Sequence, residues 1–335
     1  MKNKQIVFTK ACQAELLDAP VPSPGDGEVL IRTGRTLISS GTELSVLSGK
    51  APEDSVWKRL FAFPYVAGYT NVGVVVECGV NVPESLLGKK VCSSGYHANY
   101  AAVALSEIRD IPDDIPDDCS IFFNLAEIAM HGVRRGEIKW GDSAAIYGAG
   151  ILGQFAAQFC LMCGARKVFV IDVSDYRLGL LPKRPRLIPV NAAAQTPLDV
   201  VLQNDDGRQV DIVYELTGNE SLIPREFDLL REMGTMVIVS SPLGASWFDF
   251  HDLCNRLSFK IVGAHNFSHP KIESPYAPWT NKRDCAFFFD MFRHGDIDMS
   301  KMISNRISCD EAPGIYQELL RDRGRFMGVV IDCED

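Results

Sequence analysis

A glycine-rich segment near the centre of the chain, 148–153, constrains the fold more than any other feature. It reads Gly-Ala-Gly-Ile-Leu-Gly, follows the apolar segment 144–147 and leads into a longer apolar segment, 152–163. This succession predicts a strand, a tight turn and a helix. In such a turn the first glycine permits the bend, the second lets a pyrophosphate approach the backbone, and the third lets helix and strand pack closely. The pattern therefore predicts a dinucleotide-binding turn, with the phosphates at the positive end of the helix.

The residue that ends the next predicted strand bears on which dinucleotide binds. Asp172 follows the apolar segment 168–171 and lies 19 residues after Gly153. A carboxylate there accepts hydrogen bonds from the adenosine ribose hydroxyls and repels a 2′-phosphate, which favours NAD over NADP. Arg177 lies five residues further on. Its guanidinium is able to reach a phosphate, so NADP remains the second choice.

Polar residues also end two later strands of the same predicted domain. Thr217 and Gly218 follow the segment 211–215, and Ser240 ends the segment 235–240. The carboxyl ends of parallel strands share one edge of a sheet, and we expect the nicotinamide there. The expected cofactor-binding residues are Gly148, Gly150, Ile151, Leu152, Gly153, Asp172, Val173, Arg177, Thr217, Gly218 and Ser240.

The distribution of strand-like and helix-like segments along the sequence predicts two domains, one inserted in the other. Short β-branched segments separated by turn residues dominate the first part and return after about residue 300, which indicates a mostly antiparallel β domain. Strands and helices alternate between these parts, which indicates a parallel sheet with helices on both faces. We predict a β domain over 1–123 and 300–335 and a Rossmann domain over 124–299. The predicted strands are 5–8, 28–33, 73–77, 144–147, 168–171, 211–215, 235–240, 260–262 and 328–332, and the predicted helices are 124–134, 152–163 and 227–231.

Length, charge and cysteine content narrow the class of protein. A chain of 335 residues is long enough for two cores. Its formal net charge of -9 does not favour binding to the phosphates of nucleic acid, which require clustered Lys and Arg. The short basic segment 183–186 is interpreted as a solvated connection. No apolar run approaches the roughly 18 residues of a membrane span. Ten cysteines without regular spacing suit reduced thiols, so we expect a cytoplasmic protein.

Over nearly its whole length the chain resembles the medium-chain dehydrogenase/reductase superfamily, which includes the zinc alcohol and polyol dehydrogenases. The motifs that carry the resemblance are the segments 37–43, 67–73, 88–91 and 96–100 and the glycine turn. The resemblance implies a GroES-like β domain joined to a Rossmann domain. It also implies a homodimer formed through the Rossmann sheet.

The departures from the zinc enzymes are as informative as the matches. Ser40 and Tyr69 stand where zinc members carry a cysteine and a histidine, and Asn124 matches a further ligand position. None of the three is a thiolate, imidazole or carboxylate, the ligands from which a tetrahedral zinc site is built. The cluster of four closely spaced cysteines that binds the structural zinc is missing as well. We therefore expect no metal; the acidic side chains of Glu43 and Glu127 are the alternative ligands, but acidic groups at a turn or on a helix are usually solvated.

Without zinc, another group has to handle the proton of the alcohol. Thr42 matches the proton-relay hydroxyl of the family, and Tyr69 is either an acid/base or substrate-orienting group or a side chain packed in the vacated metal pocket. Ser40 and Asn124 either bind substrate hydroxyls or fill space. These four residues are the expected catalytic set.

Two histidines and an aromatic region remain open to two interpretations. His97 and His131 are either titratable site residues or satisfied core residues. The segments 263–270 and 276–280 combine aromatic and hydroxyl-bearing side chains, which suits a sugar or cyclitol but also an exposed or interface loop.

These features favour a zinc-independent oxidoreductase that transfers a hydride between NAD(H) and a secondary alcohol or ketone, such as that of a sugar, polyol or cyclitol. One alternative is an NAD(P)H-dependent enone or quinone reductase, whose glycine turn has a different sequence in the family. The other is a non-catalytic dinucleotide-binding protein, since the loss of zinc ligands is also what an inactive enzyme would show.

Overall fold

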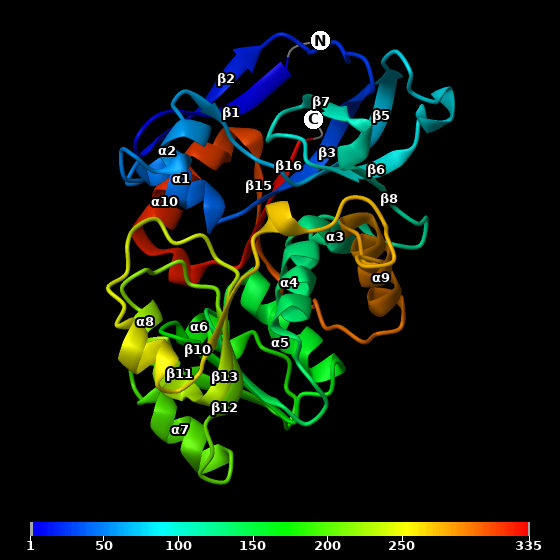
Figure 1. Ribbon diagram of the computed structural model, residues 1–335. Coiled ribbons are helices and arrows are strands. Elements are labelled where there is room, and N and C mark those ends of the chain that lie inside the picture. Colours follow the sequence, from blue (N-terminus) through cyan, green and yellow to red (C-terminus); the bar gives the residue numbers. More distant parts are fainter. Residues whose placement is uncertain (1–2, 334–335) are drawn as a thin grey trace. The chain divides into compact units, whose positions relative to one another are not determined.

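The computed structural model describes residues 3–333 and divides the chain into two compact units (Figure 1). The β unit comprises Met1–Asn124, Cys285–Arg293 and Met299–Asp335, and the Rossmann unit comprises Leu125–Asp284 and His294–Asp298. The segment Cys285–Arg293 groups with the β unit, whereas we placed all of 124–299 in the Rossmann domain. Arg293 gives one reason, because it makes two hydrogen bonds of 2.6 Å to the Asp114 carboxylate of the β unit.

The β unit is built from two sheets. One has the order β2-β1-β4, and the other has the order β15-β16-β3-β5-β6-β8, with β7 also paired to β3. All of these pairs are antiparallel except β15 with β16, so the predicted mostly antiparallel fold is confirmed. The strands are β1 (Asn3–Lys10), β2 (Gln13–Ala19), β3 (Glu28–Ile38), β4 (Tyr65–Val66), β5 (Asn71–Cys78), β6 (Lys90–Ser93), β7 (Tyr100–Ala104), β8 (Ile108–Asp110), β15 (Ile303–Ser308) and β16 (Gly328–Asp332).

The tail of the β unit contains a helix that the sequence analysis missed, because it predicted only short β segments after residue 300. Helix α10 buries Ala312, Tyr316 and Leu319 along one face, and the i, i+4, i+7 spacing of these residues is that of an amphipathic helix. The helices of this unit are α1 (Thr42–Ser48), α2 (Val56–Leu60), α3 (Asp117–Ser120) and α10 (Ala312–Asp322), with 3-10 turns at η1 (Glu84–Leu86), η2 (Leu105–Glu107), η6 (Cys309–Glu311) and η7 (Arg323–Arg325).

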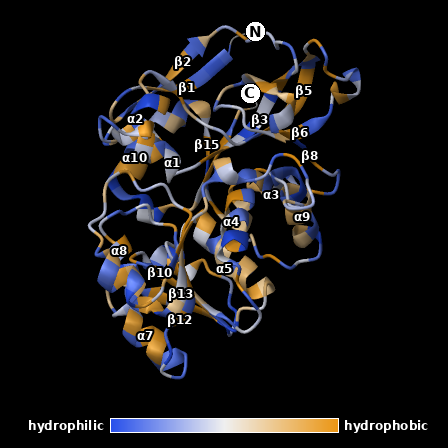
Figure 2. Cartoon of the chain, viewed as in Figure 1, coloured by the Kyte–Doolittle hydropathy of each residue, from blue (hydrophilic) through white to orange (hydrophobic). Residues whose placement is uncertain are grey.

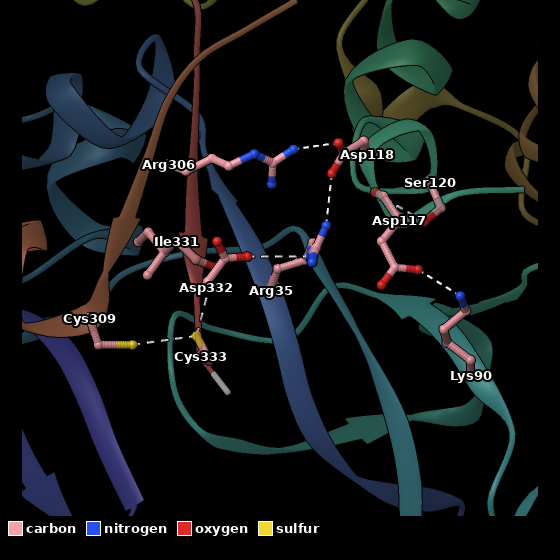
Figure 3. Close-up of polar contacts among 10 residues, drawn as sticks. All are labelled: Arg35, Lys90, Asp117, Asp118, Ser120, Arg306, Cys309, Ile331, Asp332 and Cys333. Atoms are coloured by element: carbon pink, nitrogen blue, oxygen red, sulfur yellow. Dashed lines mark hydrogen bonds and ion pairs between the residues drawn. The ribbon is translucent and has the colours of Figure 1, made fainter. Parts of the chain in front are cut away.

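Charged side chains connect the carboxyl-terminal strands β15 and β16 to strand β3 and helix α3 (Figure 3). Arg35 of β3 donates a 2.7 Å hydrogen bond to Asp118 of α3 and forms a 3.4 Å ion pair with Asp332 of β16. Arg306 of β15 binds the same Asp118 carboxylate. The last two strands are therefore integral to the sheet that contains β3 and β5.

The Rossmann unit holds one six-stranded sheet in the order β11-β10-β9-β12-β13-β14, with every pair parallel. This order confirms the predicted doubly wound fold, and it reverses between β9 and β12, where such folds bind ligands. The strands are β9 (Ser143–Tyr147), β10 (Lys167–Asp172), β11 (Leu187–Asn191), β12 (Val210–Glu215), β13 (Leu230–Ile238) and β14 (Lys260–Gly263). The helices within this unit are α5 (Ile151–Met162), α6 (Asp175–Gly179), α7 (Pro197–Asn204) and α8 (Ile223–Glu226), with shorter turns at η3 (Phe227–Leu229), η4 (His251–Asn255) and η5 (Asn266–Ser268). Helix α4 (Phe123–Gly136) has its first two residues in the β unit, and helix α9 (Asn281–Arg293) has its last nine there.

Apolar residues are frequent in the inner strands of this sheet, and Figure 2 shows them in orange in β12 and β13. The predicted helix over 227–231 is wrong, because the helical turn η3 ends at Leu229 and Leu230 already pairs with Val210 of β12. Apolar residues on both sides of this junction are buried in one core cluster, so hydrophobicity alone did not separate turn from strand. Among residues 3–333, none of the helices combines the length and apolar character needed to cross a membrane.

Candidate active site

The glycine turn joins β9 to α5 and leaves an open approach to its backbone. Gly148 has a φ of +103°, a conformation that favours glycine. A Cβ on Gly153 would lie 1.8 Å from the carbonyl oxygen of Gly148, so no side chain fits there. A Cβ on Gly150 would meet only Nη1 of Arg177, at 3.7 Å. The three glycines thus have the geometry that the predicted pyrophosphate site requires, and Ile151 and Leu152 form the first turn of α5.

The two charged residues expected at the adenosine end both stand beside this turn. One carboxylate oxygen of Asp172 accepts a 2.7 Å hydrogen bond from the Ala149 amide, and the other accepts a 2.9 Å bond from the Ser174 amide. The guanidinium of Arg177 lies near Gly150. Val173, also expected to contact the cofactor, is exposed. A negative and a positive group are therefore placed where they are able to distinguish NAD from NADP.

Glu215, which the sequence analysis missed, connects the loops at the carboxyl edge of the sheet. It is the last residue of β12 and is fully buried. Its Oε1 atom accepts hydrogen bonds from the Thr217 amide and hydroxyl, both at 2.6 Å, and from the Gly218 amide at 2.9 Å. Its Oε2 atom accepts one from the Ser240 hydroxyl. The three expected residues Thr217, Gly218 and Ser240 are thus brought together, and the available signal was a carboxylate that directly ends an apolar strand.

In the β unit, the hydroxyl groups of two other side chains contact the Tyr69 phenol. The Tyr69 hydroxyl is hydrogen-bonded to Ser39 and lies 3.3 Å from the Thr42 hydroxyl. Burial raises the pKa of Tyr69 to about 12, although the bonds to Ser39 and Thr42 oppose the shift. The phenol therefore keeps its proton at neutral pH and acts there as a donor. Ser39, which the sequence analysis did not single out, makes this contact, and its neighbour Ser40 is partly buried. A bond from Ser40 to a substrate hydroxyl stays a prediction.

Asn124 forms a hydrogen bond with the backbone of the same tyrosine. Its Nδ2 atom donates a 3.1 Å hydrogen bond to the Tyr69 carbonyl oxygen. This bond fixes the main chain that carries the phenol. Asn124 therefore has a structural partner, and a direct bond from Asn124 to a substrate hydroxyl stays a prediction.

A buried carboxylate, Glu43, lies next to this group. Its Oε1 atom accepts a 2.9 Å hydrogen bond from the Ser39 amide, and its Oε2 atom accepts one from the Tyr316 hydroxyl and lies 3.1 Å from His97 Nε2. His97 is therefore a buried partner of Glu43 and has a structural role. The sequence offered no signal for Tyr316, which is 273 residues away from Glu43.

The side chains at the matched zinc positions do not fit a zinc ion. Ser40, Tyr69 and Asn124 supply hydroxyl, phenol and amide groups, and zinc sites in proteins are built from thiolate, imidazole and carboxylate groups. The nearby carboxylate of Glu43 is already held by three protein groups. Within residues 3–333, no three His, Cys, Asp or Glu side chains lie close enough together to hold a metal ion.

His131 anchors the loop that follows β14. Its Nε2 atom lies 2.9 Å from the Ser268 hydroxyl, and its ring stacks on His269 with 4.7 Å between the centroids. Burial lowers the pKa of His131 to about 4, so the ring is neutral near pH 7. His269 in turn lies 3.1 Å from the buried Asp284 carboxylate. Further along this loop, Tyr276 is 100% exposed, whereas the Trp279 ring is partly buried and packs against the guanidinium groups of Arg134 and Arg283.

Comparisons with known proteins agree with this architecture. The model of the family described as "Zinc-binding dehydrogenase" matches residues 152–280. Among curated proteins, the L-threonine 3-dehydrogenase of Shewanella sp. (strain ANA-3) is 27% identical over 265 residues, which cover 70% of this chain and 76% of the relative.

Two solved structures share the fold over nearly their whole length. A protein of Sinorhizobium meliloti 1021 described as a zinc-binding dehydrogenase, bound to NADP, has a TM-score of 0.82 and 19% identity, covering 99% of this chain and 100% of its own. A protein of Escherichia coli CFT073 described as a short chain alcohol dehydrogenase, complexed with NADH, has a TM-score of 0.81 and 17% identity, covering 99% of each chain. In sequence over most of its length and in fold, the chain is therefore similar to enzymes of the medium-chain alcohol and polyol dehydrogenase type.

Proposed function

We propose that this enzyme interconverts a secondary alcohol and a ketone with NAD(H), and that it does so without zinc. The observation that carries the proposal is the Tyr69 phenol, which stands at a matched zinc-ligand position and is bound by the hydroxyl groups of Ser39 and Thr42. Such a chain of hydroxyl groups is able to deliver or remove a proton, which is the task that the metal and its relay share in zinc enzymes.

The choice of NAD rests on Asp172. Its carboxylate lies at the glycine turn through the bond to the Ala149 amide, and negative charge there disfavours a 2′-phosphate. The similar structures include one with NADH and one with NADP, so fold alone does not select the cofactor. Arg177 beside Gly150 is the feature that would favour NADP.

The protein's own groups suggest how the proton moves. Bound NAD(H) supplies or accepts the hydride at the substrate carbon. In the reductive direction, the Tyr69 hydroxyl donates its proton to the carbonyl oxygen as the new C–H bond forms. The resulting phenolate regains a proton through the hydroxyl of Ser39 or Thr42. In the oxidative direction the same steps run in reverse, and the high pKa of Tyr69 makes its phenolate scarce at neutral pH. We therefore propose that carbonyl reduction is the faster direction near pH 7.

The substrate class and the assembly also stay proposals. Exposed rings in the loop after β14, such as Tyr276 and Phe267, support a sugar, polyol or cyclitol as the substrate, because such rings stack on the faces of sugars. Among residues 3–333, strand β14 pairs with a neighbour on one side only. An unpaired strand edge is able to pair with a second copy, which supports the homodimer.

The test is hydride transfer after exhaustive chelation. The chelated protein is offered NADH with a panel of ketoses and cyclic ketones, and NAD with the matching polyols, while absorbance of NADH is followed. We expect turnover that is unaffected by the chelator. Activity that is lost on chelation and restored by zinc contradicts the metal-free mechanism. Tight NADH binding without turnover across the panel supports a non-catalytic binding protein instead.

A further inference from the structure

Glu215 is the meeting point of the two loops at the carboxyl edge of the Rossmann sheet. Its carboxylate accepts hydrogen bonds from Thr217, Gly218 and Ser240, with donor distances of 2.6 and 2.9 Å to the first two. All four donors are neutral, and two of them are backbone amides. One buried carboxylate thus holds the loop after β12 and joins it to Ser240, two residues after the end of β13.

This connection lies directly against the glycine turn. A Cβ on Gly148 would lie 3.2 Å from the carbonyl of Leu216 and 3.4 Å from the Thr217 amide. A Cβ on Gly218 would lie 4.0 Å from that of Ser240. The Glu215 loop therefore begins beside the pyrophosphate turn and continues toward β13. It crosses the place between β9 and β12 where the strand order reverses and where a dinucleotide passes from its adenosine half to its nicotinamide half.

A second buried acid, Glu226 of α8, stands near the first. Its side chain is fully buried, and neither of its carboxyl oxygens has a hydrogen-bond partner among the described residues. Burial, and then the charge of Glu215, raise the pKa of Glu226 to about 9. Two ionised carboxylates here would repel each other in a medium of low dielectric. The four donors are arranged around Glu215, whereas Glu226 has none within residues 3–333 and keeps its proton at neutral pH.

We infer that Glu215 is a positioning residue for the nicotinamide half of the bound dinucleotide, acting through the loops that it holds together. The inference rests on the proposed NAD(H) cofactor. It assigns to Glu215 no contact with the cofactor. Without its carboxylate, the Thr217–Gly218 loop and the Ser240 hydroxyl lose their common acceptor, and the backbone bond from the Ser240 amide to the Glu215 carbonyl remains. The glycine turn and Asp172 keep their own contacts.

The test compares two ligands that share the adenosine half. NADH carries the nicotinamide ring, and ADP-ribose lacks it. Binding of both to the full-length protein is measured by calorimetry for Glu215→Gln and for the control Glu232→Gln, which makes the same change at an exposed residue of β13. A glutamine presents an NH₂ group to donors that need an acceptor, and bonds to a charged acceptor are the strong ones. We expect Glu215→Gln to weaken NADH about 10- to 100-fold and to leave ADP-ribose within about twofold.

Each result of this experiment either supports or overturns the role of Glu215. Equal weakening of both ligands would show that Glu215 supports the whole fold, and unchanged binding of both would show that it positions nothing; either result overturns the inference. If Glu215→Gln fails to fold, Ser240→Ala removes only the donor that joins the second loop, and it should weaken NADH alone. Failure of the parent protein to bind either ligand would instead overturn the proposed cofactor and, with it, this inference.

Discussion

The proton of Tyr69 is held by burial, and this has a consequence for catalysis. The phenol has lost much of its hydration, and the neighbouring groups that favour its ionised form are the neutral hydroxyls of Ser39 and Thr42. The charge of Glu43 acts in the opposite direction and raises the pKa further. A tyrosine in this setting is a hydrogen-bond donor and a weak acid, which is the form needed to protonate a carbonyl oxygen.

Replacing Tyr69 with phenylalanine should therefore slow the chemistry while leaving the fold intact. The change removes one hydroxyl and keeps the ring that packs in the site. We expect kcat for carbonyl reduction to fall about 100-fold or more, the range of general acid catalysis. Tyr96→Phe, at an exposed tyrosine of the same unit, is the control for loss of a phenol. Retention of more than a third of the parent kcat by Tyr69→Phe would show that another group delivers the proton.

Asp172 leads to a second prediction, about the choice of cofactor. Asp172→Asn keeps the shape of the side chain and its acceptor oxygen for the Ala149 amide, but removes the negative charge. Coulombic repulsion of a 2′-phosphate should then disappear, and Arg177 remains to attract it. We expect the ratio of NADP to NAD affinity to rise at least about tenfold, measured by competition with NADH. An unchanged ratio would mean that Asp172 serves only to shape the turn.

At the scale of the element, different glycines of the turn serve the stability of the fold and the binding of the cofactor. Gly153→Ala places a methyl group against the Gly148 carbonyl, which is backbone and cannot move aside cheaply. Gly150→Ala meets only the end of the flexible Arg177 side chain, yet its methyl group occupies space needed by the pyrophosphate. Replacing glycine with alanine should therefore reduce stability at position 153 and cofactor binding at position 150.

We expect Gly153→Ala to lower the free energy of unfolding by about 3 kcal/mol, the upper end of the usual cost of overpacking. Gly150→Ala should leave stability within about 0.5 kcal/mol and weaken NADH at least about tenfold. Gly179→Ala is the control, since a Cβ there meets nothing within 4 Å. Denaturant unfolding and NADH titration of the three variants give both quantities. Equal loss of stability in the first two would contradict the distinction.

Elements with a strong local signal were predictable from the sequence, and those defined by distant contacts were not. The turn at Gly148 and the strand 328–332 carry their own pattern of glycines or apolar residues, and both lie where expected. Helix α10 was missed because Pro313 and Gly314 in its first turn resemble a loop signal. Proline is nonetheless well tolerated in the first turn of a helix.

The candidate site was predictable to a similar extent. Motif matching identified Tyr69 and Thr42, which the structure brings within 3.3 Å of each other. It selected Ser40, which matches a zinc-ligand position, and gave no signal for Ser39, whose bond to Tyr69 exists only in the folded chain. Glu215 and Tyr316 act through hydrogen bonds that exist only in the folded chain. Their roles follow from tertiary structure, and a linear pattern does not contain them.

At the scale of the whole molecule, two buried groups of the Rossmann unit link stability to pH in opposite directions. His131 has its pKa lowered from 6.5 to about 4, so between these values the unfolded chain binds more protons and stability rises with pH. Glu226 has its pKa raised from 4.5 to about 9. Between these values the folded chain binds the extra proton, so stability falls as pH rises. Above about pH 6.5 the contribution of His131 is complete, and of these two groups only Glu226 still acts.

Glu226→Gln isolates this effect, because it keeps the shape of the protonated acid and removes its titration. Each pH unit between the two pKa values of Glu226 is worth about 1.4 kcal/mol. From pH 6.5 to 8.5, the variant should therefore gain about 2.7 kcal/mol relative to the parent, as measured by urea unfolding at constant ionic strength. All other groups titrate alike in the two proteins, so their contributions cancel in the difference. A difference that stays constant over this range would mean that Glu226 is already ionised in the folded chain.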